Sequence, residues 1–366
     1  MRITAVTTWF PTRTAPSRGS FVVRDLHAIA QHHEVRLVHL VPPQDDDGTR
    51  RLDHEGIEVL RIPMAPSQPA SVVRAAAALP AALRGADAVH SMAFSTLLPL
   101  VLHRPMVPWM HTEHWSALTT PATLSRPARA ALPVVRRALK APDLVTAVCD
   151  FLAAPIRDVR GAKPTTIVPC IVEPHPLAAR RSRADGALRL VSTGGLIERK
   201  DPLVAVETIV RLRERGVDAR LRWVGDGPLR EATIARAREL CIADAVELLG
   251  VRDAQGVRDE LAAADIFFGP TRADNFFVSA AEALVAGRPV ALGSTGGQGE
   301  YAHPSVSRLV DAQDPGLYAD AIASLDESTR DLSSEQIAAT IGDRFSAENV
   351  GIGYDCALRT AMRSRP

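Results

Sequence analysis

Short apolar runs alternate along the chain with longer segments whose apolar positions recur at helical spacing. In the second half, the run 188–193 precedes a helical segment at 201–215, and the run 219–224 precedes another that ends at Glu239. Apolar runs bounded by glycine are typical of buried strands, whereas apolar positions three and four residues apart indicate amphipathic helices. This alternation predicts βα units and parallel sheets.

The first half of the chain has the same alternation, and a polar, proline-containing stretch at 174–187 separates the halves as a predicted linker. The periodicity predicts two doubly wound α/β domains, at 1–173 and 188–346, and residues 347–366 follow them as a C-terminal segment. Strands are predicted at 2–9, 34–40, 57–62, 88–90, 106–110, 144–148, 165–169 and 246–249, and helices at 21–32, 71–83, 121–140 and 149–159.

The segment 264–286 contains the most informative local pattern. A buried strand at 264–270 is followed by a helix at 276–286. Asp274 or Asn275 can cap this helix, and Gly287 ends it. The free N–H groups at the start of a helix form an anion site, here near Phe277 and Val278.

Two acids accompany that helix. Asp274 precedes it and Glu282 follows eight residues later. At about 100° per residue, their side chains point to neighbouring faces. Carboxylates for sugar hydroxyls beside N–H donors for phosphate describe a sugar-nucleotide pocket. The alternative is a surface helix with a capping Asp274 and a solvated Glu282.

Glycine follows three predicted strands of the second domain, at 188–193, 219–224 and 246–249, where a ligand could approach the backbone. The positions are Gly194 and Gly195, then Gly225, then Gly250 with Val251. In the first domain, the loop at 10–20 contains Gly19 and opens a helix, but it lacks the GxGxxG dinucleotide pattern. His111 directly follows the predicted strand 106–110, at the carboxyl end where parallel sheets present ligand residues.

Composition limits the possible classes. The chain has 366 residues, 46% of them hydrophobic and 23% charged, which is ordinary for a globular protein. No apolar run approaches the ~20 residues of a membrane span. The four cysteines are scattered without a CxxC pair, which favours a reducing cytoplasm and no metal cluster. The triplet Asp45-Asp46-Asp47 is predicted to be a solvated turn.

The second half resembles the donor-site signature of retaining GT-B glycosyltransferases of family 4. The family pattern is an acid, seven residues and a Glu, then G-x-P-V and G-G-x-x-E. The family usually has Glu where this chain has Asp274, Gly where it has Phe277, and Arg where it has Gly195. The matching residues are Asp274 with Glu282, Gly287-Arg288-Pro289-Val290, and Gly296-Gly297-Gln298-Gly299-Glu300.

The resemblance implies a GT-B fold, with two Rossmann-like domains facing across a cleft and the C-terminal helix crossing back to the N-terminal acceptor domain. It implies transfer of a sugar from a nucleotide sugar, such as a UDP- or GDP-sugar, to a hydroxyl group with retention of the anomeric configuration. In this family the departing phosphate is thought to take the acceptor proton. Neither a metal nor another cofactor is then required.

The resemblance also implies roles for individual residues. Lys200, with Arg199 in place of the missing arginine, would neutralise the leaving diphosphate. Glu282 would accept the ribose hydroxyls, and the backbone at Gly250 and Val251 would meet the base. The remaining positions are Asp274 and His111 at the donor sugar, Gly19 at the first loop near the diphosphate, and Phe277 and Val278 as N–H donors.

Two other functions remain open. The departures at Asp274, Gly195 and Cys170, where the family usually has Asn, are compatible with a catalytically weak nucleotide-sugar-binding partner subunit. A GT-B sugar-nucleotide epimerase would convert the donor without an acceptor.

The charge is unevenly spread. Residues 1–172 carry 19 basic and 13 acidic side chains, whereas residues 173–366 carry 24 and 29, and the segment 114–142 has no acid. Because the first half holds the acceptor site in this fold, we expect an acceptor that is anionic or presented at the inner face of the membrane. The alternative is a solvated helix face and a small soluble acceptor. No nucleic-acid partner is expected.

Overall fold

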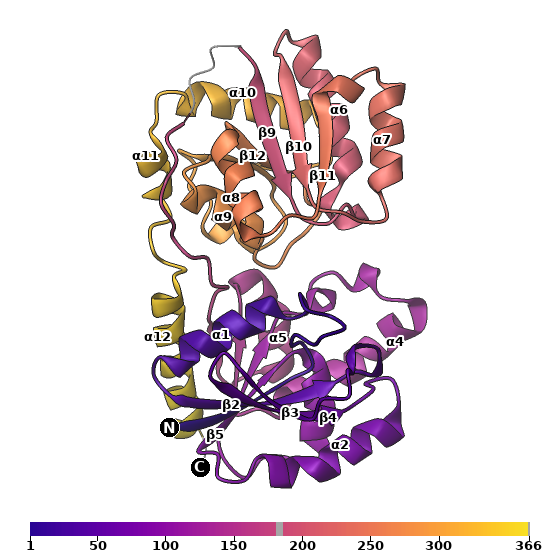
Figure 1. Cartoon of the computed structure of the whole chain (residues 1–366), viewed down its shortest axis with the longest axis vertical. Coiled ribbons are helices and arrows are strands. Elements are labelled where there is room, and N and C mark those ends of the chain that lie inside the picture. The colour runs from indigo at the N-terminus through magenta and orange to yellow at the C-terminus, as the bar shows by residue number, and fades with distance from the viewer. Residues whose placement is uncertain (181–185, 365–366) are drawn as a thin grey trace. The chain divides into compact units, whose positions relative to one another are not determined.

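The computed structural model describes residues 1–180 and 186–364, and these residues form two compact units (Figure 1). Unit 1 comprises residues 1–171 together with the C-terminal segment from Phe345, and unit 2 comprises Val172–Arg344. Each unit contains one sheet with helices on both faces. In the described part of the chain, no helix combines the length and the apolar character needed to cross a bilayer.

Unit 1 contains an eight-stranded sheet in the order β3-β4-β2-β1-β5-β6-β7-β8. Neighbouring strands in this sheet are parallel, except for the edge pair β3–β4, which is antiparallel. The sequence did not predict β3. The strands are β1 (Arg2–Thr7), β2 (Glu34–Val41), β3 (Arg51–His54), β4 (Ile57–Pro63), β5 (Ala88–Met92), β6 (Trp109–Glu113), β7 (Leu144–Ala147) and β8 (Thr165–Ile167).

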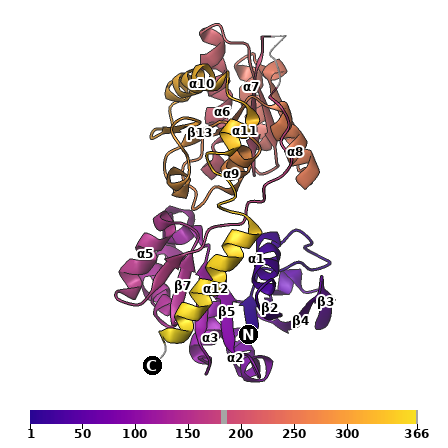
Figure 2. The same ribbon diagram turned by 90° about the vertical axis from the view of Figure 1, so that its left-hand side faces the viewer.

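Helices α1 and α12 lie side by side on one face of this sheet (Figure 2). Ile29 of α1 and Leu358 of α12 belong to the same buried cluster as Ile3 and Met110 of the strands. The C-terminal helix therefore packs within unit 1, although the chain reaches it only after passing through unit 2. The helices are α1 (Ser20–Ala30), α2 (Pro69–Ala82), α3 (Leu97–Leu102), α4 (Arg126–Val135), α5 (Asp150–Arg160) and α12 (Ala347–Arg363).

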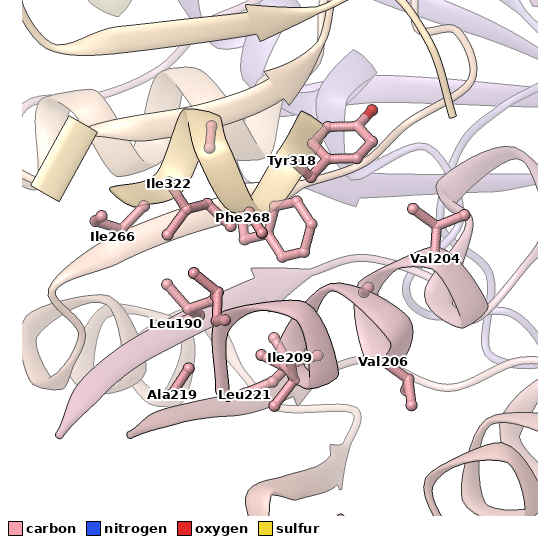
Figure 3. Close-up of a cluster of buried hydrophobic side chains, with 14 of the residues drawn as sticks. Leu190, Val204, Val206, Ile209, Ala219, Leu221, Ile266, Phe268, Tyr318 and Ile322 are labelled. Carbon is pink, nitrogen blue, oxygen red and sulfur yellow. The ribbon is translucent and has the colours of Figure 1, made fainter. Parts of the chain in front are cut away.

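Unit 2 contains a six-stranded parallel sheet in the order β11-β10-β9-β12-β13-β14. On one face, Leu190 and Phe268 of the strands pack against Ile209 of α6 and Tyr318 and Ile322 of α10 (Figure 3). The strands are β9 (Leu188–Thr193), β10 (Ala219–Val224), β11 (Val246–Gly250), β12 (Ile266–Gly269), β13 (Val290–Gly293) and β14 (Ser307–Val310). The helices are α6 (Pro202–Glu214), α7 (Arg230–Glu239), α8 (Ala254–Ala263), α9 (Val278–Val285), α10 (Pro315–Thr329) and α11 (Ser334–Ala338).

Arg288 is fully buried in unit 2 and connects three segments. Its guanidinium donates to the carbonyls of Leu261 and Ala262 at the end of α8, each at 2.9 Å, and to Ser334 Oγ at 2.9 Å. It also donates to the Ala178 carbonyl at 3.2 Å. The first part of the predicted linker 174–187 is thus attached to unit 2, while residues 181–185 lie outside the described residues.

Strand order places one topological switch point in each sheet. In unit 1 the chain adds β2 to one side of β1 and later β5 to the other; in unit 2 it adds β10 to one side of β9 and later β12 to the other. Loops that leave neighbouring strands at such a point run apart and open a crevice at the carboxyl ends of the strands, where open α/β sheets bind ligands. The fold alone therefore directs attention to the loops after β1 and β5, and after β9 and β12.

Gly19 illustrates how tightly the first of these loops is built. It precedes α1 with φ 71°, and a Cβ at this position would lie 2.3 Å from the Trp9 carbonyl oxygen. Both the left-handed backbone conformation and the contact with the end of β1 exclude a side chain.

We expect Gly19→Ala to lower the free energy of unfolding by roughly 2–4 kcal/mol, because backbone strain and a steric clash add. Gly48→Ala is the matched control: its φ is 82°, but nothing lies within 4 Å of the added Cβ. That variant should lose only about 1 kcal/mol. Urea unfolding of both variants measures the difference, and equal losses would show that the contact with Trp9 is unimportant.

Candidate active site

At the switch point of unit 2, Asp274 is held between two cations. Its Oδ2 lies 2.8 Å from Lys200 Nζ and 2.5 Å from the Arg199 guanidinium. The two cations belong to the 3₁₀ turn Glu198–Lys200 after β9, whereas Asp274 follows β12. The predicted phosphate-binding lysine, the predicted replacement arginine and the predicted sugar-binding acid therefore form one cluster.

The cluster is partly shielded from water, and this affects its protonation. Burial alone would raise the pKa of Asp274, but the charges of Lys200 and Arg199 outweigh burial and lower it. Burial lowers the pKa of Lys200, and Asp274 opposes that effect. Asp274 is thus an anion at neutral pH, and the three groups together carry a net charge of about +1, which favours an anionic ligand.

The Phe277 ring contacts the Lys200 ammonium of this cluster. Lys200 Nζ lies 3.6 Å from the centre of the Phe277 ring, a cation–π contact. The Phe277 backbone is left-handed, with φ 60°, although its side chain is bulky and buried. Its N–H donates to Asp274 Oδ1 at 3.2 Å, and its carbonyl accepts from the Tyr301 hydroxyl at 2.8 Å. The family resemblance places glycine here, and the backbone retains the conformation that glycine favours.

The helix after this turn begins later than predicted. α9 starts at Val278 rather than at residue 276, and Phe277 precedes it without a side-chain cap. The prediction that Asp274 or Asn275 caps the helix is therefore wrong: Asp274 Oδ1 accepts from the N–H of Phe277, which precedes the helix, and its Oδ2 pairs with the two cations. The helical-angle argument relating Asp274 to Glu282 also fails, since Asp274 is not on the helix. Glu282 lies within α9 and is half-buried.

The predicted glycine turns of unit 2 meet at the carboxyl ends of the strands. The Gly225 N–H donates to the Gly250 carbonyl at 2.8 Å, and a Cβ on Gly225 would lie 2.0 Å from the Gly194 carbonyl oxygen. Gly195 follows in the same turn. Val251, next to Gly250, is 79% exposed. The exposed apolar side chain of Val251, next to the backbone of Gly250, which carries no side chain, is suited to contact with a planar base.

His111 does not lie where the sequence predicted. Strand β6 is Trp109–Glu113, shifted from the predicted 106–110, so His111 lies in its middle and is completely buried. Its Nδ1 is 2.8 Å from Ser91 Oγ and its Nε2 is 3.2 Å from Glu113 Oε2. The expectation that His111 directly follows the strand is wrong. The residues at the end of the strand are Glu113 and His114.

Both residues are among those that line a cavity of about 530 Å³ at the switch point of unit 1. The cavity lies at the ends of β1, β5 and β6, and its walls are mainly aromatic: Trp9, Phe21, Phe94 and Trp115. Glu113 Oε1 accepts from the backbone N–H groups of His114 and Trp115, at 2.9 and 2.8 Å. His111 was predicted at the end of the strand because the predicted strand ended three residues too early.

Backbone strain accompanies both switch points. Ala93, which lines the unit 1 cavity, has φ 81°, and Asp201, directly after Lys200, has φ 49°. With Phe277, these are three of the five described non-glycine residues that have positive φ. Such strain gathers at functional sites, because the surrounding structure must hold it in place.

The aspartate triplet is not a solvated turn. Asp45 pairs with Arg18 at 2.8 Å, Asp46 pairs with Arg50, and Asp47 pairs with Arg61 at 2.8 Å. The Asp45 and Asp47 side chains are each only 4% exposed, so the expectation of solvation is wrong. Among the described residues, no group of three or more His, Cys, Asp or Glu side chains is arranged to hold a metal ion.

Comparison with known families identifies both units. Residues 21–170 match the family model described as "Glycosyl transferase 4-like domain", and residues 187–328 match "Glycosyl transferases group 1". The chain belongs to the group 1 glycosyltransferases. The predicted GT-B fold is confirmed by solved structures that cover the whole chain.

Curated relatives of this glycosyltransferase are distant. It is 25% identical to 2-deoxystreptamine glucosyltransferase of Streptomyces kanamyceticus over 279 residues, which are 71% of each protein. It is 32% identical to D-inositol 3-phosphate glycosyltransferase of Corynebacterium urealyticum over 166 residues, 43% of this chain and 39% of that protein. The second match thus spans less than half of either protein.

Among solved structures, sucrose-phosphate synthase from Thermosynechococcus elongatus superposes with a TM-score of 0.78 at 19% identity, covering 100% of both chains. Anabaena Alr3699/HepE in complex with UDP and glucose superposes with a TM-score of 0.74 at 15% identity, covering 98% of this chain and 99% of that one. At these identities, the likeness establishes the fold alone.

A buried acid in unit 1 makes a testable electrostatic prediction. Asp25 of α1 is 3% exposed, and burial raises its pKa to about 7, opposed in part by the Tyr354 hydroxyl and Arg24. Between about pH 4 and pH 7 the folded state keeps a proton that the unfolded state has lost. The contribution of Asp25 to the free energy of unfolding is therefore most favourable below about pH 4. It decreases as the pH rises and is constant above about pH 7.

Relative to Asp25→Asn, the unaltered protein should lose roughly 2–3 kcal/mol of unfolding free energy between pH 5 and pH 8. Urea unfolding at both pH values measures this difference. The exposed Asp158→Asn variant controls for the loss of one carboxylate. Parallel pH dependence for the protein and for Asp25→Asn would show that Asp25 is ionised in the folded state.

Proposed function

We propose that this glycosyltransferase moves a sugar from a nucleotide-sugar donor to an acceptor hydroxyl, with retention at the anomeric carbon. The observation that carries the proposal is the cluster of Arg199, Lys200 and Asp274 at the switch point of unit 2. Two cations beside one carboxylate suit a ligand that combines a diphosphate with sugar hydroxyls. The start of α9 adds backbone N–H groups at Val278, where the helix dipole favours an anion.

The donor would displace part of the ion-pair cluster. In the structure, Asp274 accepts hydrogen bonds from both cations. A diphosphate would take over Lys200 and Arg199, and Asp274 would then be available to a sugar hydroxyl. Exchange of one anion for another preserves the pairing of buried charge, so binding would not leave an uncompensated ion.

The rest of the donor fits the surrounding residues. Glu282, on α9, would accept the ribose hydroxyls. The backbone at Gly250 and the exposed Val251 would contact the base. The relatives support a nucleotide donor, since one is a GDP-mannose-dependent mannosyltransferase of Mycobacterium tuberculosis and the Anabaena structure contains UDP. We infer a UDP- or GDP-sugar and no resident metal, with the departing phosphate accepting the acceptor proton.

We assign the acceptor to the aromatic cavity of unit 1. Flat aromatic walls can stack against a sugar or another ring, and the His114 imidazole supplies a polar group. Burial lowers the pKa of His114 to about 4, so the ring is neutral at pH 7. A neutral imidazole can accept a hydrogen bond from a hydroxyl group or donate one to it, without adding charge.

The first test is a donor screen by thermal shift with UDP-, GDP-, ADP- and TDP-sugars, followed by a donor-hydrolysis assay. We expect one nucleotide class to raise the melting temperature and to release nucleoside diphosphate slowly without an acceptor. Binding without release would favour a partner subunit that only holds the nucleotide sugar. Conversion of the donor sugar without release of nucleoside diphosphate would identify an epimerase.

Lys200→Ala should remove most turnover, because a cation on the leaving diphosphate contributes roughly 2–4 kcal/mol to the transition state, or about 30- to 1,000-fold in rate. Steady-state release of nucleoside diphosphate measures the effect. Lys163→Ala, a surface lysine of unit 1, is the matched control and should keep full turnover. Near-normal turnover of Lys200→Ala would transfer the role to Arg199, to be tested by Arg199→Ala.

Glu282→Ala should chiefly raise the donor KM, because ribose contacts exist in both the ground state and the transition state. Asp274→Ala should act more on kcat, since it also unpairs Arg199 and Lys200. Steady-state kinetics of the two variants separates these effects. The opposite pattern would reverse our assignment of the ribose and sugar ends.

A further inference from the structure

A second cavity of unit 1 continues from the aromatic one. It has a volume of about 850 Å³ and lies among α2, α3, α4 and the 3₁₀ turn η5 (Arg136–Lys140). Pro66, Leu98 and Val135 line both cavities, so the two form one continuous depression. We call the outer part, lined by α2, α3, α4 and η5, the aliphatic groove.

The aliphatic groove exposes large apolar side chains. Val73 of α2 is 56% exposed, Val101 and Leu102 of α3 are 46% and 61% exposed, and Val134 of α4 is 64% exposed. Single exposed apolar residues are normal on protein surfaces, but a contiguous group marks a site of interaction. These four come from three separate helices and meet on one surface, so the group is a product of the fold.

The charged side chains that line the aliphatic groove are all positive. Arg137 and Lys140 are the charged residues among those lining it, and both are exposed. Neither has an acidic partner within the described residues. They belong to the stretch 114–142, which contains no acid at all. An apolar trough with a cationic edge is complementary to a molecule that has a hydrocarbon chain and a negative group.

We propose that the aliphatic groove binds the hydrocarbon chain of an anionic, membrane-borne lipid acceptor, with Arg137 and Lys140 at its negative group. This rests on the proposed function, since the reacting head of the lipid would occupy the adjoining aromatic cavity. A small soluble acceptor would need only the inner cavity and would leave the exposed valines and leucine uncovered. The continuity of the two cavities allows one amphipathic molecule to fill both.

The first experiment measures binding of alkyl phosphates with chains of four to ten carbons to the full-length protein, below their micelle concentrations. Calorimetry without any donor is sufficient. Affinity should rise about fourfold per added methylene, the increment for burying one CH₂ group. Inorganic phosphate should bind far more weakly than decyl phosphate. An affinity that does not depend on chain length would overturn the proposal.

Matched variants then locate the chain. Val101→Gln and Leu102→Gln together should weaken decyl phosphate about tenfold but leave butyl phosphate nearly unchanged. Ile352→Gln is the control, because Ile352 of α12 is 46% exposed, as Val101 is, but lies outside the groove. Equal effects of the groove variant and of Ile352→Gln would contradict the assignment.

The charged edge has its own control. Arg137→Gln and Lys140→Gln should each weaken every alkyl phosphate by about fivefold at low salt, independently of chain length. Arg252→Gln, an exposed arginine of unit 2, should have no effect. A uniform response to all three substitutions would indicate that net charge alone governs binding.

Vesicle sedimentation tests the membrane source. The protein should pellet with phosphatidylcholine vesicles that contain phosphatidylglycerol, less so in added salt, and the Val101→Gln/Leu102→Gln variant should pellet less. Equal recovery with pure phosphatidylcholine, or binding of alkyl phosphates without any vesicle binding, would overturn a membrane-borne acceptor. Because these assays contain no donor, their failure leaves the donor chemistry of Lys200 and Asp274 untouched. A failed donor screen would likewise leave the lipid result intact.

Discussion

One carboxylate between two cations organises unit 2. Asp274 follows β12, whereas Arg199 and Lys200 follow β9, so their contacts fasten together the two loops that diverge at the switch point. All three side chains are at least partly buried, and a charge removed from water needs a partner. The same pairing holds the Lys200 ammonium between the Asp274 carboxylate and the Phe277 ring.

Phe277 shows how this arrangement tolerates an unfavourable backbone. A bulky residue with φ 60° costs roughly 1–3 kcal/mol. Burial of a phenylalanine side chain stabilises the fold by about the same amount or more. The ring also contacts the Lys200 ammonium with its face. Gly269 makes room for the ring, because a Cβ there would lie 2.6 Å from it. Gly269 on β12 thus accommodates a phenylalanine at the position where the family resemblance places glycine.

In unit 1, a network of buried polar groups lies at the end of β6. His111 and Glu113 are both completely buried and contact each other, and Glu113 also accepts two backbone N–H groups at the end of β6. This network fixes the turn that carries His114 and Trp115 into the aromatic cavity. These polar atoms are largely satisfied within the protein, so the wall of the cavity is mainly apolar. The two units therefore differ in chemistry: one presents charge at its switch point, and the other presents aromatic surface.

The sequence by itself determined the alternation of strands and helices, the glycine turns after β9, β10 and β11, and the candidates Lys200, Arg199 and Asp274. The alternation, the glycine turns and Asp274 follow from local periodicity and motif spacing, which depend on neighbours within a few residues, whereas Lys200 and Arg199 follow from the family resemblance. Only the tertiary structure showed that the three charges touch, that His111 is buried while His114 lines a cavity, and that exposed side chains of three helices form one groove. Strand order and the convergence of distant loops decide such contacts, because packing brings together residues that no local pattern relates.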